Sequence, residues 1–108
     1  MELTSKQRAQ LRGLANGIDT ILIVGKDGIG ENLIKQANDA LEARELLKGK
    51  VLETSLMTAR EAAQALSPVT RSEVVQVIGT KFILYRPSHK ADKRDKIVLV
   101  QDRRKSGR

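Results

Sequence analysis

The residues with the clearest chemical use are four in a row, Gly25-Lys26-Asp27-Gly28, which form a GxxG motif. Glycine can adopt positive φ and carries no Cβ, so the backbone N–H groups of such a loop can approach a ligand closely. A helix is expected directly after the loop, and the positive N-terminal end of a helix attracts anions. With Lys26 at the tip, the motif favours a bound phosphate group. The alternative is a plain turn between a strand and a helix.

Two predicted elements position this loop. Before it, the run Ile-Leu-Ile-Val at 21–24 is rich in β-branched residues and predicts a fully buried strand. After it, a helix is expected over 31–43, because apolar residues recur there at helical spacing. Gly30 occupies the expected N-cap of that helix, where serine or threonine would be a stronger cap.

A second strand is predicted over 45–53. Alternation places Leu47 and Val51 toward the core, while Lys48 and Lys50 share the opposite face. A strand, a helix and a second strand in this order form a right-handed unit, so we expect the two strands to be parallel.

The charge of the chain is unevenly placed. The formal net charge is +7 over 108 residues. Residues 1–85 carry 11 basic and 10 acidic side chains, whereas residues 86–108 carry 9 basic and 3 acidic ones. A basic tail on a nearly neutral body indicates an anionic polymer as partner, although a purely solubilising tail has the same composition.

The first predicted helix carries part of the basic surface. A capping box of Thr4 and Gln7 predicts a helix over 5–14, with an αL cap at Asn16-Gly17. Leu11 and Leu14 are expected to point inward. Three basic residues lie on its outer side, which is either a nucleic-acid-facing edge or a solvated face: Lys6, Arg8 and Arg12.

The second half of the chain predicts a helix and a hairpin. Thr58 and Glu61 form another capping box, and Pro68 is expected just past the end of that helix. Strands are predicted over 74–78 and 81–86, joined by Gly79-Thr80 in a type II′ turn. A charged connector, a short edge strand and a disordered basic tail are expected to follow, over 87–96, 97–101 and 102–108.

Several classes of site are disfavoured. The chain has no cysteine, which excludes disulfides and thiolate metal sites, and it has no apolar stretch of membrane length. The one histidine, His89, lies in the charged connector with no recognisable nucleophile or carboxylate pattern around it, so no catalysis is predicted. Without a signal segment, a cytoplasmic protein is expected. No cofactor or small-molecule substrate is predicted.

The aromatic residues limit how the chain could bind nucleic acid. Phe82 and Tyr85 are the only two, and their spacing places them on opposite faces of one strand. Modules that stack bases need several aromatic side chains on one surface. Any RNA binding is therefore expected through backbone, shape and phosphate contacts. Tyr85 is expected to be half-buried in packing, and the alternative is that it stacks on a single base.

Four separated segments resemble the CRM domain, the chloroplast RNA splicing and ribosome maturation domain, in its bacterial stand-alone YhbY-type form. They are LTSKQRAQLRGLA, VGKDG, ELLKGKVL and VVQVIGTKFILYRPS, within roughly residues 3–100. The resemblance implies an α/β fold of order α-β-α-β-α-β-β, with a mixed four-stranded sheet, three helices and a KH-like GxxG loop. It also implies an RNA-binding domain over 1–101 that associates with precursors of the large ribosomal subunit. A monomer is expected.

Ten positions are candidate RNA contacts: Gly25, Lys26, Asp27, Gly28, Lys6, Arg8, Arg12, Lys48, Lys50 and Arg86. Three positions depart from the family pattern. Asp27 places a carboxylate in the proposed phosphate loop, where it either lowers the positive field or points outward, and Gly30 replaces a more typical polar cap. Gly49 replaces a branched apolar residue, so the second strand is expected to be either weaker or closely approached there. The alternative function is a protein-interaction adaptor whose basic tail docks an acidic partner.

Overall fold

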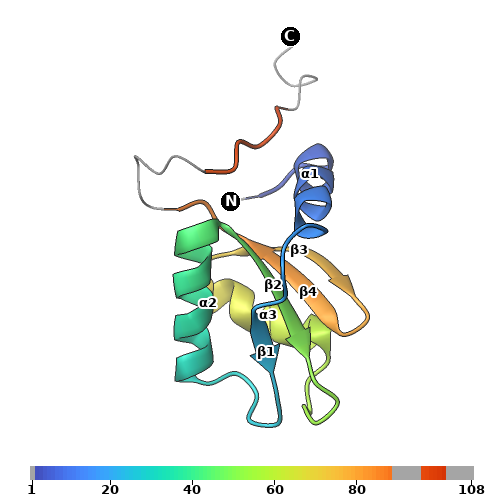
Figure 1. The fold of residues 1–108 in the computed structure, drawn as a ribbon, viewed down its shortest axis with the longest axis vertical. Coiled ribbons are helices and arrows are strands. Elements are labelled where there is room, and N and C mark those ends of the chain that lie inside the picture. The colour runs from blue at the N-terminus through green and yellow to red at the C-terminus, as the bar shows by residue number, and fades with distance from the viewer. Residues whose placement is uncertain (1, 89–95, 102–108) are drawn as a thin grey trace.

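The computed structural model describes residues 2–88 and 96–101 (Figure 1). The predicted order and the mixed four-stranded sheet are confirmed. The elements are α1 (Ser5–Ala15), β1 (Leu22–Val24), α2 (Glu31–Arg44), β2 (Leu46–Val51), α3 (Ala59–Thr70), β3 (Glu73–Ile78) and β4 (Lys81–Tyr85). Both predicted capping boxes are present, at Thr4 with Gln7 and at Thr58 with Glu61. None of the helices within the described ranges is both long and apolar enough to span a bilayer.

The sheet has the strand order β1-β2-β4-β3. β1 and β2 are parallel, as predicted, while β4 is antiparallel to both β2 and β3. The hairpin between β3 and β4 turns at Gly79-Thr80. Gly79 has φ 58, and Thr80 does not have a positive φ, which agrees with a type II′ turn.

The two faces of the sheet are covered unequally. α2 and α3 pack on one face and form the larger core with residues such as Leu47, Phe82 and Leu84. On the other face, α1 packs over Leu46 and Ile83 at one end of the strands only (Figure 1). The other end of that face carries no helix in the figure, so side chains there stay exposed.

Three details of the first two elements correct the sequence prediction. The first strand is not fully buried, because Ile21 and Ile23 are 40% and 45% exposed on the face that α1 does not reach. Leu14 is also 45% exposed, and Ala15 is buried in its place. α1 ends at Asn16 in the right-handed region, and Gly17 has no positive φ, so the predicted αL cap is wrong.

The C-terminal half also departs from the prediction at two places. Pro68 lies inside α3, which continues to Thr70. It sits in the last turn on the exposed side, where a proline removes one intrahelical hydrogen bond and leaves a carbonyl that water can reach. Residues 97–101 form no strand. His89, most of the connector and the basic tail lie outside the described residues.

Gly49 is approached closely, as predicted. A Cβ added at Gly49 would lie 2.3 Å from Cζ of Phe82, which is less than any real contact. The two residues are cross-strand partners of β2 and β4. The absence of a side chain at Gly49 therefore makes room for the Phe82 ring in the centre of the larger core.

Candidate nucleic-acid interface

The GxxG loop is a tight turn directly after β1. The N–H of Gly28 donates to the carbonyl of Gly25 at 3.1 Å and closes the turn. Gly28 has φ 69, whereas Gly25 has no positive φ, so only the second glycine needs its special conformation. The Gly28 amide is used inside the turn, and a ligand would meet other groups of the loop.

The loop opens toward the N-terminus of α2. Gly30 is the N-cap, as predicted, and it supplies no side-chain cap; the first helical bond runs from Ile34 N to its carbonyl at 3.0 Å. The first-turn N–H groups therefore lack the side-chain acceptor that serine or aspartate would provide. Loop and helix start line an open groove of about 550 Å³, the GxxG groove: Ile23, Gly25, Lys26, Asp27, Gly28, Gly30, Glu31, Asn32, Leu33 and Gln36.

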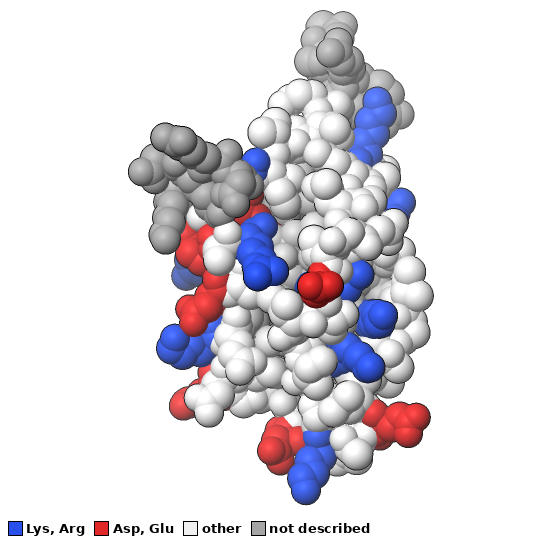
Figure 2. All heavy atoms as spheres, viewed as in Figure 1, with Lys and Arg blue, Asp and Glu red and all other residues white. Residues whose placement is uncertain are grey.

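The GxxG groove has no excess of positive charge. Among the described residues that line it, Lys26 is the one basic side chain, and Asp27 and Glu31 are both acidic; all three are exposed. Acidic and basic side chains also lie together at the lower end of the molecule in Figure 2. Backbone N–H groups and the helix dipole favour an anion there, while the two carboxylates oppose it.

A second basic feature crosses the open end of the sheet. Ile23 pairs with Lys50, Lys50 with Lys81, and Lys81 with Ile78, so one row of side chains spans all four strands. We call this the lysine row. Like charges directly opposite each other in an antiparallel pair destabilise a sheet, so the pair Lys50–Lys81 contributes nothing to folding. Figure 2 shows basic side chains over this face, above the strands.

The other predicted basic residues are distributed around this face. Lys48 lies on the same side of β2 and its Nζ donates to the carbonyl of Ile18 at 3.2 Å. On α1, Lys6 is exposed and Arg12 is partly exposed. Arg8 donates to the carbonyl of Val74, beside the bulge between Val74 and Gln76, so its guanidinium is held by the sheet.

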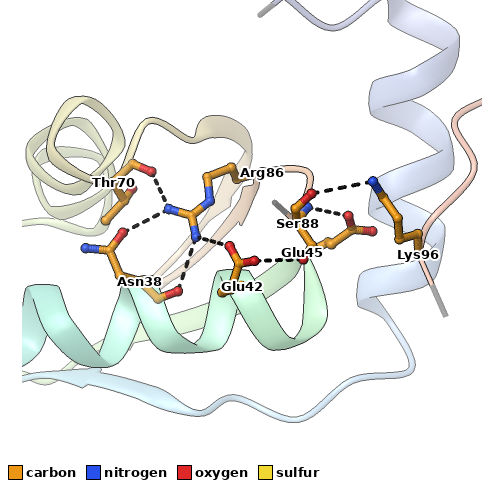
Figure 3. Close-up of polar contacts among 7 residues, drawn as sticks. All are labelled: Asn38, Glu42, Glu45, Thr70, Arg86, Ser88 and Lys96. Atoms are coloured by element: carbon orange, nitrogen blue, oxygen red, sulfur yellow. Dashed lines mark hydrogen bonds and ion pairs between the residues drawn. The ribbon is translucent and has the colours of Figure 1, made fainter. Parts of the chain in front are cut away.

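Arg86 corrects the prediction, because it is not a surface residue. It is 9% exposed, and its guanidinium donates to Oδ1 of Asn38 and the carbonyl of Thr70, both at 2.9 Å. It also forms an ion pair with Glu42 at 3.2 Å (Figure 3). A group enclosed in this way joins α2, α3 and the end of β4 and cannot contact RNA.

Comparison with known proteins places this arrangement in a family. Residues 3–86 match the model of the CRS1 / YhbY (CRM) domain. The chain belongs to the CRM family. It is 44% identical over 86 residues to the Bacillus subtilis protein named "Probable RNA-binding protein YqeI", covering 80% of this chain and 90% of that one. It is 34% identical over 89 residues to a Haemophilus influenzae protein named "RNA-binding protein", with 82% and 90% covered.

A solved structure agrees with this assignment. The CRM fold described above matches the solution structure of the hypothetical protein SAV1595 from Staphylococcus aureus with a TM-score of 0.73. The two sequences are 49% identical, and the match covers 92% of this chain and all of that one.

In this CRM domain, Glu45 is a key residue that sequence reasoning missed. It follows α2 in the left-handed region, with φ 66, and it is fully buried. Its carboxylate accepts from Ser88 N at 2.5 Å (Figure 3). It also accepts from Ile97 N at 2.6 Å. Burial, and then the nearby Glu45 charge, raise the pKa of Tyr85 above 10.0. In the sequence, the one signal that Glu45 is buried is its position between a predicted helix and an apolar strand.

Residues 96–101, the C-terminal strap, run along α1. Nε2 of Gln7 donates to the carbonyl of Val100 at 3.1 Å. Gln10 donates to the carbonyl of Val98 at 2.8 Å and accepts from the N–H of Val100 at 2.9 Å. Side-chain amides of α1 thus hold the backbone of the strap, which does not belong to the sheet.

Proposed function

We propose that this chain binds ribosomal RNA in precursors of the large ribosomal subunit and assists their assembly. The RNA backbone would contact the GxxG groove and the basic face of the sheet. The observation that carries the proposal is the lysine row, in which the half-buried Lys50 and the exposed Lys81 are cross-strand partners. Such a pair has no folding benefit and suits a phosphate backbone.

Two further lines support RNA as the partner. The family relatives from Bacillus subtilis and Haemophilus influenzae carry names that state RNA binding. The ribosomal part of the proposal rests on the resemblance to the YhbY-type form of the CRM domain. A protein in the cytoplasm, acting as a monomer, fits both.

The buried aromatic residues favour backbone contacts over base stacking. Phe82 is fully buried in the larger core, and Tyr85 is 2% exposed, so it is more buried than the sequence predicts. Neither ring can stack on a base. Contacts of this kind are dominated by phosphate and weaken steeply with salt. The basic residues 102–108 would add to this attraction.

The contacts divide into two groups by strength. Lys6, Arg12 and Lys48 lie on the α1 side and would extend the lysine row. In the GxxG groove, Lys26 and the first-turn N–H groups of α2 attract phosphate, but Asp27 and Glu31 weaken that attraction. The sheet would therefore supply most of the affinity, and the GxxG groove would fix the position of one phosphate.

A substitution in the loop tests the RNA contact. Lys26→Asp keeps both glycines and should weaken binding of a ribosomal RNA fragment about tenfold, because it replaces attraction by repulsion. Lys35→Asp, a charge reversal on the exposed side of α2, is the control and should change affinity less. Fluorescence anisotropy at fixed salt measures both variants. If wild type, Lys26→Asp and Lys35→Asp bind the RNA with equal affinity, the GxxG loop is only a turn and does not contact RNA.

Sedimentation tests the cellular role. In a sucrose gradient at low magnesium, the protein should travel with immature large-subunit particles and be depleted from mature ribosomes. Loss of the protein should let such particles accumulate. Finding it only at the top of the gradient would contradict the assembly role and favour the adaptor that docks an acidic protein partner.

A further inference from the structure

The loop between β2 and α3 carries the most exposed large apolar side chain in the described part of the chain. Leu56 is 95% exposed, compared with 39% for Leu52 in the same loop. An exposed leucine by itself is ordinary. The position of this one, beside the GxxG groove, is the feature that needs an explanation.

The β2–α3 loop packs against the GxxG loop. Leu52 N donates to the carbonyl of Val24 at 2.9 Å, which ties the loop to the end of β1. A Cβ at Gly25 would lie 3.8 Å from Cδ1 of Leu52, and a Cβ at Gly28 would lie 3.9 Å from Sδ of Met57. Two of the three large apolar side chains in the β2–α3 loop thus pack against the GxxG loop, and the third does not.

The loop is ordered by its own hydrogen bonds. Ser55 N donates to the carbonyl of Leu52 at 3.0 Å, and Met57 N donates to Oγ of Ser55 at 3.0 Å. The capping box of α3 begins directly afterwards at Thr58. The backbone on both sides of Leu56 is therefore fixed, and little backbone entropy remains to be lost when a ligand covers its side chain.

The surroundings of Leu56 favour a nucleotide base over a protein as its partner. A protein interface needs a buried apolar centre of many residues, whereas the GxxG loop and the β2–α3 loop expose several charged and polar side chains: Lys26, Asp27, Glu53 and Thr54. The GxxG loop, which Leu52 and Met57 approach, offers a site for a backbone phosphate close to Leu56. Apolar side chains such as leucine can pack against the face of an unstacked base.

We infer that Leu56 contacts an unpaired base of RNA whose backbone lies at the GxxG groove, so that the protein prefers RNA with a bulged or looped nucleotide. The inference rests on the proposed function, since it needs RNA at this end of the molecule. A continuous duplex keeps its bases stacked and offers no base face to Leu56. The phosphate contacts, in contrast, are the same for paired and unpaired RNA.

The test compares two hairpin RNAs that differ only by one adenosine bulged from the stem. Wild-type protein should bind the bulged hairpin more tightly. Leu56→Ser should lower its affinity for the bulged hairpin by roughly 3- to 10-fold, because apolar contact with the base is lost, and leave the paired hairpin unchanged. Val69→Ser, on the exposed side of the last turn of α3, is the matched control and should leave both affinities unchanged.

The outcomes separate this inference from the proposed function. If wild-type protein binds neither RNA, the proposed function fails. If it binds both RNAs and Leu56→Ser changes neither affinity, or changes both equally, only the role of Leu56 is refuted. Sedimentation velocity adds a last check: a wild-type dimer that Leu56→Ser converts to monomer would assign Leu56 to a protein contact and overturn the inference. Equal melting temperatures of the two proteins exclude unfolding as the cause.

Discussion

The two ends of α2 use opposite designs. At its start, a glycine N-cap and the GxxG loop leave backbone N–H groups without side-chain acceptors and place charges in solvent. At its end, Glu45 and Arg86 are buried, and their charges are met by Asn38, Glu42, the Thr70 carbonyl and two backbone amides. The first end suits binding and the second suits stability.

The distance between these ends matters for function. Fourteen residues of α-helix span about 21 Å, so the two designs belong to one rigid element without touching each other. We call the C-terminal end of α2, where Glu45 and Arg86 are buried, the closed end. Substitutions there should change stability and leave RNA affinity unchanged. We call the N-terminal end, with the GxxG loop, the open end. Substitutions there should change RNA affinity and leave stability nearly unchanged.

The largest expected effect is at the closed end. Glu45→Gln should lower the free energy of unfolding by about 2–4 kcal/mol, because an amide cannot accept from both Ser88 N and Ile97 N. The exposed neighbour substitution Arg44→Gln should stay within about 0.5 kcal/mol of wild type. Urea denaturation measures both. A change in RNA affinity of the folded Glu45→Gln protein would break the comparison.

Replacing glycine by alanine, once in the core at Gly49 and once in the GxxG loop at Gly25, sharpens the comparison between stability and binding. Gly49→Ala should cost about 1–3 kcal/mol, because the new Cβ would meet the Phe82 ring at 2.3 Å. Gly25→Ala places its Cβ 3.8 Å from Leu52 and needs no positive φ, so its cost should be below about 0.5 kcal/mol. RNA binding should respond in the opposite order. Two equally destabilised proteins would show that the loop is as tightly packed as the core.

The lysine row should show an effect on binding alone. Replacing both Lys50 and Lys81 by glutamine should flatten the plot of log affinity against log salt by about 1.8, or by about 1.4 on single-stranded RNA. Removing the like-charge pair should also raise the free energy of unfolding by about 0.2–0.5 kcal/mol. Arg60→Gln on α3 is the control on the opposite side of the sheet. If the salt slope of the double variant equals that of wild type, the lysine row does not contact RNA.

The smallest expected effect is a pH dependence at the closed end. Tyr85 has a pKa raised above 10.0, so the folded state keeps its proton where the unfolded state loses it. Stability from this source is intact below pH 10 and falls as pH rises above it. Wild type should lose stability in alkali faster than Tyr85→Phe. Tyr85 is the only tyrosine, so tyrosinate absorbance reports its titration directly.

The sequence predicts best what depends on near neighbours. The capping boxes at Thr4 and Thr58 and the hairpin turn at Gly79 each need only a few adjacent residues, and all three are confirmed. The GxxG loop lies between strand and helix as expected. The error at Leu14 is a shift of one position along the helix, which periodicity over 11 residues does not resolve.

What the sequence could not show depends on partners far away in the chain. Arg86 looks like any other basic residue until Asn38 and Thr70 enclose it. Lys81 becomes a candidate RNA contact only because it pairs with Lys50, and that pairing depends on the register between β2 and β4. The exposure of Ile23 likewise follows from the short reach of α1 over the sheet.

The strand order has a consequence for how the chain is made. Of the four strands that the structure describes, β4 is synthesised last, yet it lies between β2 and β3 in the sheet. Until it leaves the ribosome, β2 has only the three-residue β1 beside it, and Phe82 is missing from the larger core. The nascent chain should therefore stay protease-sensitive until β4 has emerged from the ribosome, and then fold in one step.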